Sequence, residues 1–181
     1  CSSGKIESVG GLLPLLVEME RYQSRAFPFT IRAPMGDERP GLMAEAWSRG
    51  WPDRFPIGLD ILVPGTGFEM NGAEIQTLGI ELGEPLRGET PSIRSNVGVA
   101  WRVKTETHSI VWAKSCAPST ALQKFCKEVS LAIIEVGVQP WPKSDRRWRL
   151  SHQQASEYGL LAQELWLVGD EGGPLLFDLL N

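Results

Sequence analysis

The chain has little of the side-chain chemistry on which metal sites depend. Its 181 residues contain only two histidines, His108 and His152, and three cysteines. A zinc ion is bound by three or four such side chains close together, so a histidine-rich metal site is excluded. Glu106 and His108 would share one face of a strand, but no third ligand lies nearby in the sequence. We therefore expect no metal ion and no cofactor.

Long apolar runs and a surplus of basic residues are missing as well. No segment approaches the roughly 18 consecutive apolar residues that a membrane-spanning helix needs. The formal net charge is -4 and the pI is near 5.3, whereas binding to nucleic acid phosphates relies on an excess of lysine and arginine. Nucleic acid is therefore not expected as a partner, and no small-molecule substrate is evident.

Catalytic motifs are also missing. The turn segment 64–67 lacks the lysine of a phosphate-binding loop. Cys116 and His108 could form a thiol and base pair, but nothing in the sequence orients them. We expect Cys116 and Cys126 to be buried free thiols, because free cysteine behaves as a small core hydrophobe. A disulfide between them is the alternative in an oxidising compartment. These absences favour a protein that is not an enzyme.

The chain opens with Cys1-Ser2-Ser3-Gly4 and has no initiator methionine. This start resembles a bacterial lipoprotein after removal of its signal peptide, in which the cysteine thiol carries a diacylglycerol. The resemblance implies a lipid anchor at Cys1 and a location on the periplasmic side of the bacterial envelope. Two or more acyl chains suffice for stable anchoring without a membrane-spanning helix.

Two other interpretations of Cys1 stay open. It could be the end left by processing, in an organelle-imported protein or a virion structural subunit. It could also be the nucleophile of a cysteine hydrolase, for which Cys116 is the other candidate.

The composition is that of an ordinary globular protein, with 42% hydrophobic and 22% charged residues. We expect a flexible, processed lead-in over residues 1–11 and a single α+β domain over residues 12–181, with an apolar tail at 174–181. The predicted architecture is an antiparallel sheet of about five to seven strands. Two main helices, at about 119–133 and 152–168, would pack on one face of this sheet, with a shorter helix at about 13–23 near the N-terminus.

The strongest local signal is Asn71-Gly72. This pair supplies the two positive φ angles of a type I′ turn, so it predicts a β-hairpin. The hairpin would place Glu69 directly opposite Glu74, and like charges in that position repel unless a basic partner or a cation compensates.

Two segments are candidate interaction surfaces. One is a basic and aromatic loop, in which charged side chains suit an acidic partner surface or anionic headgroups and tryptophans supply contact area. Its residues are Trp141, Lys143, Arg146, Arg147, Trp148 and Arg149. The other is the apolar tail, which either docks on the protein's own sheet or binds a partner through Leu176, Phe177 and Leu179.

Together these features predict a non-catalytic accessory or scaffold protein. It would act by protein contact within a membrane-associated assembly, anchored through lipid on Cys1.

Overall fold

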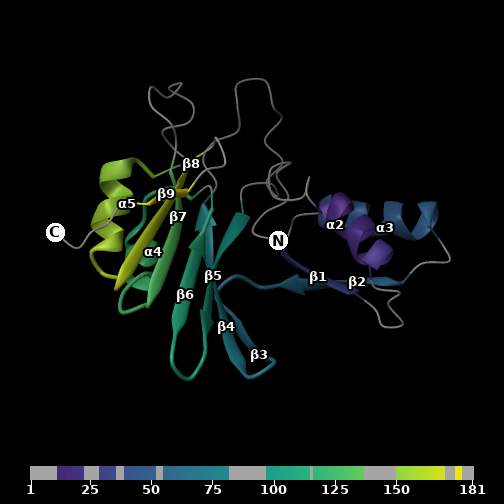
Figure 1. The fold of residues 1–181 in the computed structure, drawn as a ribbon, viewed down its shortest axis with the longest axis horizontal. Coiled ribbons are helices and arrows are strands. Elements are labelled where there is room, and N and C mark those ends of the chain that lie inside the picture. The colour runs from purple at the N-terminus through teal and green to yellow at the C-terminus, as the bar shows by residue number, and fades with distance from the viewer. Residues whose placement is uncertain are drawn as a thin grey trace. The chain divides into compact units, whose positions relative to one another are not determined.

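The structure is a computed structural model of the whole chain (Figure 1). It describes residues 12–22, 29–35, 39–51, 55–81, 97–114, 116–136, 150–169 and 174–176. The chain divides into two compact units, residues 1–63 and 64–181. The expected lead-in at 1–11 lies outside the described residues, and the single domain expected over 12–181 stays a prediction.

The first unit is a small β-α-β arrangement preceded by a helix. Its elements are α2 (Leu12–Tyr22), β1 (Phe29–Pro34), α3 (Arg39–Gly50) and β2 (Ile57–Leu62). Strands β1 and β2 pair in parallel, as expected for two strands joined through a helix. Arg32 and Asp60 are register partners in this pair, and their side chains form an ion pair of 2.8 Å.

The core of this unit forms around Trp47, which is 1% exposed. The indole N–H of Trp47 donates to the carbonyl oxygen of Phe55 at 3.3 Å. The centroids of the Trp47 and Phe55 rings lie 5.3 Å apart. Leu16 from α2 and Ile31 from β1 belong to the same buried cluster. The indole thus has both an apolar environment and a hydrogen-bond partner, as a buried tryptophan requires.

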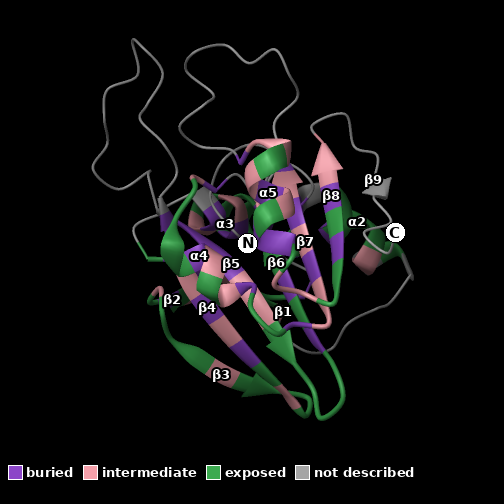
Figure 2. Ribbon diagram, turned by 90° about the vertical axis from the view of Figure 1, so that its left-hand side faces the viewer, coloured by how far each residue is buried: buried purple, intermediate pink, exposed green. Residues whose placement is uncertain are grey.

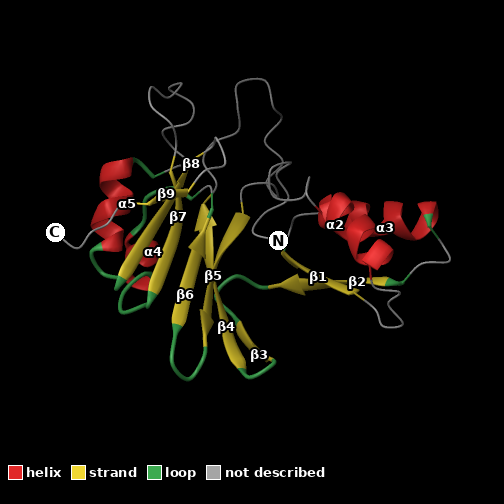
Figure 3. Ribbon diagram, viewed as in Figure 1, coloured by secondary structure: helices red, strands yellow, loops and turns green. Residues whose placement is uncertain are grey.

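The second unit is built on one seven-stranded sheet with the order β3-β4-β5-β6-β7-β8-β9. The first strands are β3 (Gly67–Met70), β4 (Ala73–Glu81), β5 (Val97–Lys104) and β6 (Ser109–Ala113), and they pair antiparallel in succession. Strands β7 (Leu131–Val136) and β8 (Glu164–Gly169) continue the sheet in parallel with β6, and β9 (Pro174–Leu176) closes it antiparallel. Figure 3 shows the sheet in yellow with its helices beside it.

The prediction of an antiparallel sheet is therefore wrong, and the sheet is mixed. Helix α4 (Thr120–Phe125) connects β6 to β7, and helix α5 (His152–Gly159) connects β7 to β8. Connections of this kind carry the chain back across the sheet, so the next strand pairs in parallel. Both helices are shorter than the expected segments 119–133 and 152–168, and each covers only the first part of its segment. The later residues, 131–136 and 164–169, form strands instead.

Polar caps begin both helices. Ser119 caps α4 by accepting from the backbone N–H of Leu122. Ser151 and Gln154 form a capping box at the start of α5, with each side chain accepting from the other residue's backbone N–H. Such caps satisfy backbone donors that have no partner inside the helix.

The core of the second unit lies between the sheet and these helices. Sheet residues of one parity, such as Val111, Ala132, Ile134 and Leu165, are buried together with Leu122 of α4. Figure 2 shows buried residues recurring along the central strands, while β3 and the turn that follows it are exposed or half-buried. The two-residue alternation arises because successive side chains of a strand point to opposite faces.

The predicted hairpin is confirmed. Strand β3 pairs with β4 around Asn71 and Gly72, whose φ angles are 51° and 77°. Glu69 and Glu74 are direct register partners, and Lys104 of β5 lies across from Glu74 on its other side. A basic residue is therefore placed where it reduces the repulsion between the two carboxylates.

Candidate functional site

The carboxyl ends of the neighbouring strands β6, β7 and β8 lie together at one end of the sheet. We call this row of strand ends the carboxyl edge. The three strands are parallel, so their last residues, Ala113, Val136 and Gly169, lie at this edge. Leu150 returns to the same edge, where it forms an isolated bridge with Val136. In sheets with parallel strands, ligands bind outside the carboxyl ends of the strands. The carboxyl edge is therefore the place to look for functional side chains.

Lys114 and Glu135 lie side by side at this edge. Ala113 of β6 pairs with Ile134 of β7, and Lys114 and Glu135 are the next residue on each strand. Both side chains are half-buried. By the alternation of the strands they lie on the face opposite to the helices, in line with Trp112.

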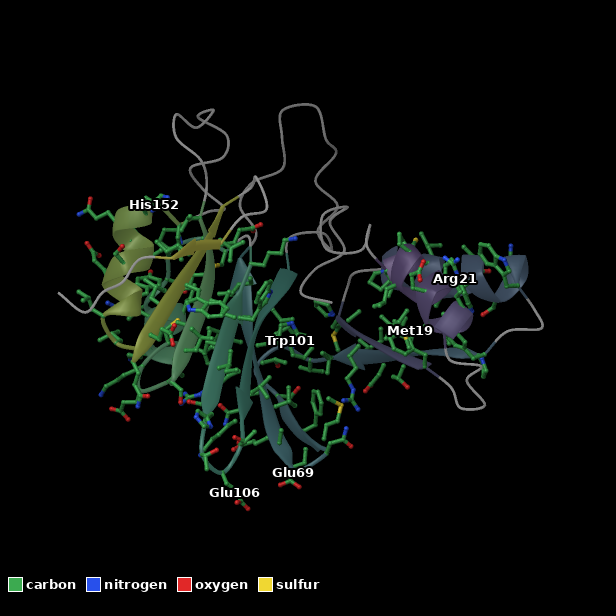
Figure 4. The ribbon with its side chains drawn as sticks, viewed as in Figure 1. Met19, Arg21, Glu69, Trp101, Glu106 and His152 are labelled. Carbon is green, nitrogen blue, oxygen red and sulfur yellow. The ribbon has the colours of Figure 1, made fainter. Side chains whose placement is uncertain are left out.

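His152 is the third side chain at the carboxyl edge. It is the first residue of α5 and follows the capping residue Ser151. The capping box fixes where the helix begins, and the bridge between Leu150 and Val136 fixes where the chain approaches the sheet. His152 is half-buried, and Figure 4 shows it at the opposite end of the sheet from Glu106.

A buried cluster lies beneath the edge, where α4 and α5 cover the sheet. Tyr158 of α5 donates its hydroxyl hydrogen to the carbonyl oxygen of Ser119 at 3.2 Å and accepts from the N–H of Ser119 at 2.9 Å. Cys116 and Cys126 belong to the same core, and both are free thiols, as expected. The tyrosine thus ties the start of α4 to α5.

These thiols are unsuited to nucleophilic chemistry at neutral pH. Burial, with a smaller contribution from the nearby Cys126, raises the pKa of Cys116 to about 12. Burial also raises the pKa of Cys126, to about 11, although the charge of Arg102 opposes the shift. The thiolate is the reactive form of cysteine. The alternative of a cysteine hydrolase that uses Cys116 is therefore wrong, and Cys1 lies outside the described residues.

The opposite edge of the sheet carries the other histidine. His108 lies in the turn between β5 and β6, where its Nδ1 is 2.8 Å from the hydroxyl oxygen of Thr107. His108 and Glu106 are both exposed. They occupy a turn rather than the strand face that their spacing suggested.

The residues expected to bind a partner fall mostly outside the described part of the chain. This applies to Trp141, Lys143, Arg146, Arg147, Trp148, Arg149, Phe177 and Leu179. Leu176 lies in β9, whose backbone pairs with β8 and places Leu176 opposite Trp166. The role of these residues in partner binding stays a prediction.

The structure places other tryptophans together, and the sequence analysis missed them. Trp101, Trp112, Ile133 and Trp166 are register partners across four adjacent strands. Trp112 is 41% exposed and Trp166 is 36% exposed, on the face opposite to the helices. Figure 4 labels Trp101, which belongs to strand β5. The alternation of side chains along a strand indicates which residues of that strand share a face. It does not show that the tryptophans are adjacent, because that depends on the register between strands.

Comparisons by sequence find no relatives: no protein family and no curated protein matches the chain. In the described part of the chain, none of the helices has the length and apolar character required to cross a membrane.

Comparisons of the fold find similar solved structures. Human tRNase Z, short form, matches 90% of this chain with a TM-score of 0.63 and 16% identity. YhfI from Bacillus subtilis, described as a metallo-β-lactamase fold protein, matches 88% with a TM-score of 0.60 and 13% identity. Zn²⁺-bound PqqB from Methylobacterium extorquens matches 83% with a TM-score of 0.60 and 15% identity. The chain spans 68%, 58% and 52% of these three proteins, respectively.

The described residues do not fit a zinc ion of the kind that PqqB binds. Within the described ranges, no three side chains of histidine, cysteine, aspartate and glutamate lie close enough together to hold a metal ion. Three protein ligands are the usual minimum for a zinc site.

The fold matches correct the predicted function. The expectation of a non-catalytic accessory, scaffold or structural protein, with the character of a lipoprotein, is wrong, because the matching structures include a metallo-β-lactamase fold protein and a tRNase. The exclusion of nucleic acid and small-molecule substrates conflicts in part with the same matches. A protein partner and an envelope location stay predictions. The described part of the chain has the metallo-β-lactamase fold.

Proposed function

We propose that this chain is a hydrolase whose substrate binds at the carboxyl edge of β6, β7 and β8. The observation that carries the proposal is the fold match to three solved structures, which covers 83% to 90% of the chain. The three half-buried side chains at this edge, Lys114, Glu135 and His152, provide the chemistry.

Each of these side chains has a role that hydrolysis can use. Histidine and glutamate transfer protons to and from reacting groups, which contributes about 100-fold to 10,000-fold to the rate of a reaction. The ammonium group of lysine binds phosphate oxygens as a point charge. His152, which starts the helix on one face of the sheet, would act as the proton-transfer group at this edge. Lys114 would bind the anionic group of the substrate and Glu135 would orient the water, both from the other face.

The proposed substrate is a small phosphoester. One of the matching structures is a tRNase, whose substrate contains phosphodiester bonds. The net charge of -4 disfavours a long polyanion, since such binding relies on many lysine and arginine contacts. A small phosphoester needs only a local cation, and Lys114 supplies one at the carboxyl edge.

The chain offers a matched pair of variants for the test. His152 lies at the carboxyl edge and His108 at the opposite edge, so His152→Ala and His108→Ala make the same chemical change at the two ends of one sheet. The assay follows p-nitrophenol release from bis(p-nitrophenyl) phosphate and p-nitrophenyl phosphate. Nitrocefin and p-nitrophenyl acetate serve as a β-lactam and a carboxylic ester for comparison.

We expect the wild type to cleave a phosphoester, and His152→Ala to lower kcat about 100-fold or more. His108→Ala is expected to leave kcat unchanged. Circular dichroism confirms that both variants are folded. Equal loss in the two variants would contradict the carboxyl edge as the site. Cleavage of the β-lactam or carboxylic ester alone would contradict the phosphoester as the substrate class, and no cleavage of any of the four would contradict the hydrolase.

A further inference from the structure

The two histidines of the chain cannot bind the same metal ion. They are the only histidines among the 181 residues, and the structure describes both. His108 precedes β6, whose first residue Ser109 accepts at its carbonyl oxygen from the N–H of Ser130 at 2.9 Å. His152 follows Leu150, which pairs with Val136 at the last residue of β7. The length of β7 therefore separates the two histidines.

That separation exceeds what a zinc site allows. Strand β7 has six residues, and at about 3.3 Å per residue it spans roughly 17–20 Å. Zinc–nitrogen bonds are about 2 Å long, so two ring nitrogens on one ion lie about 4 Å apart or closer. In Figure 4, His152 lies at one end of the sheet and Glu106, in the turn of His108, lies at the other.

Within the described ranges, no other side chains complete a zinc site around either histidine. Cys116 and Cys126 lie in the apolar core. Zinc binds the deprotonated thiolate, which burial disfavours in both residues. No group of three possible ligands forms around either histidine in the described part of the chain. Any zinc site would therefore have to rely on a single histidine.

We infer that this chain does not retain zinc, although it has the fold of a zinc-bound protein. The inference rests on where the two histidines lie and does not depend on the proposed hydrolase activity. If the chain cleaves phosphoesters, it does so with side chains at the carboxyl edge rather than with a histidine-bound zinc ion.

Bound metal provides a test that does not involve turnover. The purified chain is incubated with excess zinc chloride and passed through a gel filtration column, and the zinc that stays with the protein is measured by mass spectrometry. PqqB, treated in parallel, is the positive control. The wild type, His152→Ala and His108→Ala are compared, and their melting temperatures are measured with and without zinc.

We expect all three proteins to carry the same background of zinc, far below one ion per chain, with melting temperatures that zinc does not change. Close to one or more zinc ions per wild-type chain would overturn the inference, whether or not the His152 substitution removes them. Because the readout is bound metal, failure of this inference is distinguishable from failure of the proposed activity, which the phosphoester assay reports.

Discussion

Replacing Gly159 by alanine should destabilise the second unit, because a Cβ atom at this position has no room. Gly159 is the last residue of α5 and is buried. A Cβ atom placed there would lie 2.7 Å from Cγ and 2.8 Å from Cβ of Leu165, and it would also overlap Cδ2. Optimal contacts between carbon atoms are about 3.5–4.0 Å.

The magnitude follows from which atoms clash. A new rotamer of Leu165 moves Cγ and Cδ2 away, but Cβ is fixed by the backbone of β8, so the helix or the strand must shift. Overpacking of this kind costs about 1–3 kcal/mol. The better helix propensity of alanine offsets at most about 1 kcal/mol. The free energy of unfolding should therefore fall by about 1–2 kcal/mol, which corresponds to a melting temperature lower by a few degrees.

Gly50→Ala is the matched control. Gly50 is also the last residue of a helix, α3, but a Cβ atom there meets nothing within 4 Å. This variant should be neutral, or more stable by up to about 1 kcal/mol. Urea denaturation followed by circular dichroism measures both variants. Gly159→Ala as stable as the wild type would refute the packing of α5 against β8.

Three further predictions concern the turn, the cap and the buried thiols. Gly72→Val, at a φ of 77°, should lower the free energy of unfolding by about 1–3 kcal/mol in urea denaturation; no loss would contradict the type I′ turn. Ser151→Ala, which removes the capping box of α5, should cost about 0.5–2 kcal/mol in the same assay, and an unchanged midpoint would argue against this cap. Unfolded thiols ionise near 9.0, whereas Cys116 keeps its proton until about pH 12, so the folded state binds more protons between these values. Stability should therefore fall as pH rises from 9 to 12. The free energy of unfolding should depend less steeply on pH in Cys116→Ala than in the wild type. An equal dependence in the two proteins would show that Cys116 is accessible to solvent.

Local structure was predictable where a few neighbouring residues determine it. The Asn71-Gly72 hairpin has the backbone angles that this pair favours. Ser151 and Gln154 have the spacing that is typical of a capping box, and they form one. Helix α2 (Leu12–Tyr22) lies close to the predicted segment 13–23. In each case the signal and the structure span the same short stretch of chain.

The sheet topology was not predictable in this way. Residues 131–136 and 164–169 carry apolar residues that suit either a helix or a buried strand, and their pairing with β6 decides the outcome. Strand order and direction depend on contacts between residues far apart in the sequence. An antiparallel sheet was therefore predicted where the sheet is mixed.

The candidate site depends on that same topology. Lys114, Glu135 and His152 are separated in the sequence, and only the parallel pairing of β6 with β7 and the return of the chain at Leu150 bring them to one edge. The sequence analysis considered His152 only as one of two histidines, and it did not consider Lys114 or Glu135. Their residue types are too common to identify a site without the fold.

The most direct test of the carboxyl edge as the functional site is a titration followed by nuclear magnetic resonance. The chain has two histidines, so the ring Cε1–H region of the spectrum contains two signals, and the His152→Ala and His108→Ala variants assign them. We predict that bis(p-nitrophenyl) phosphate shifts the His152 signal in a saturable manner and leaves the His108 signal in place. A shift of the His108 signal alone, or no shift of either signal while the substrate is cleaved, would contradict the account.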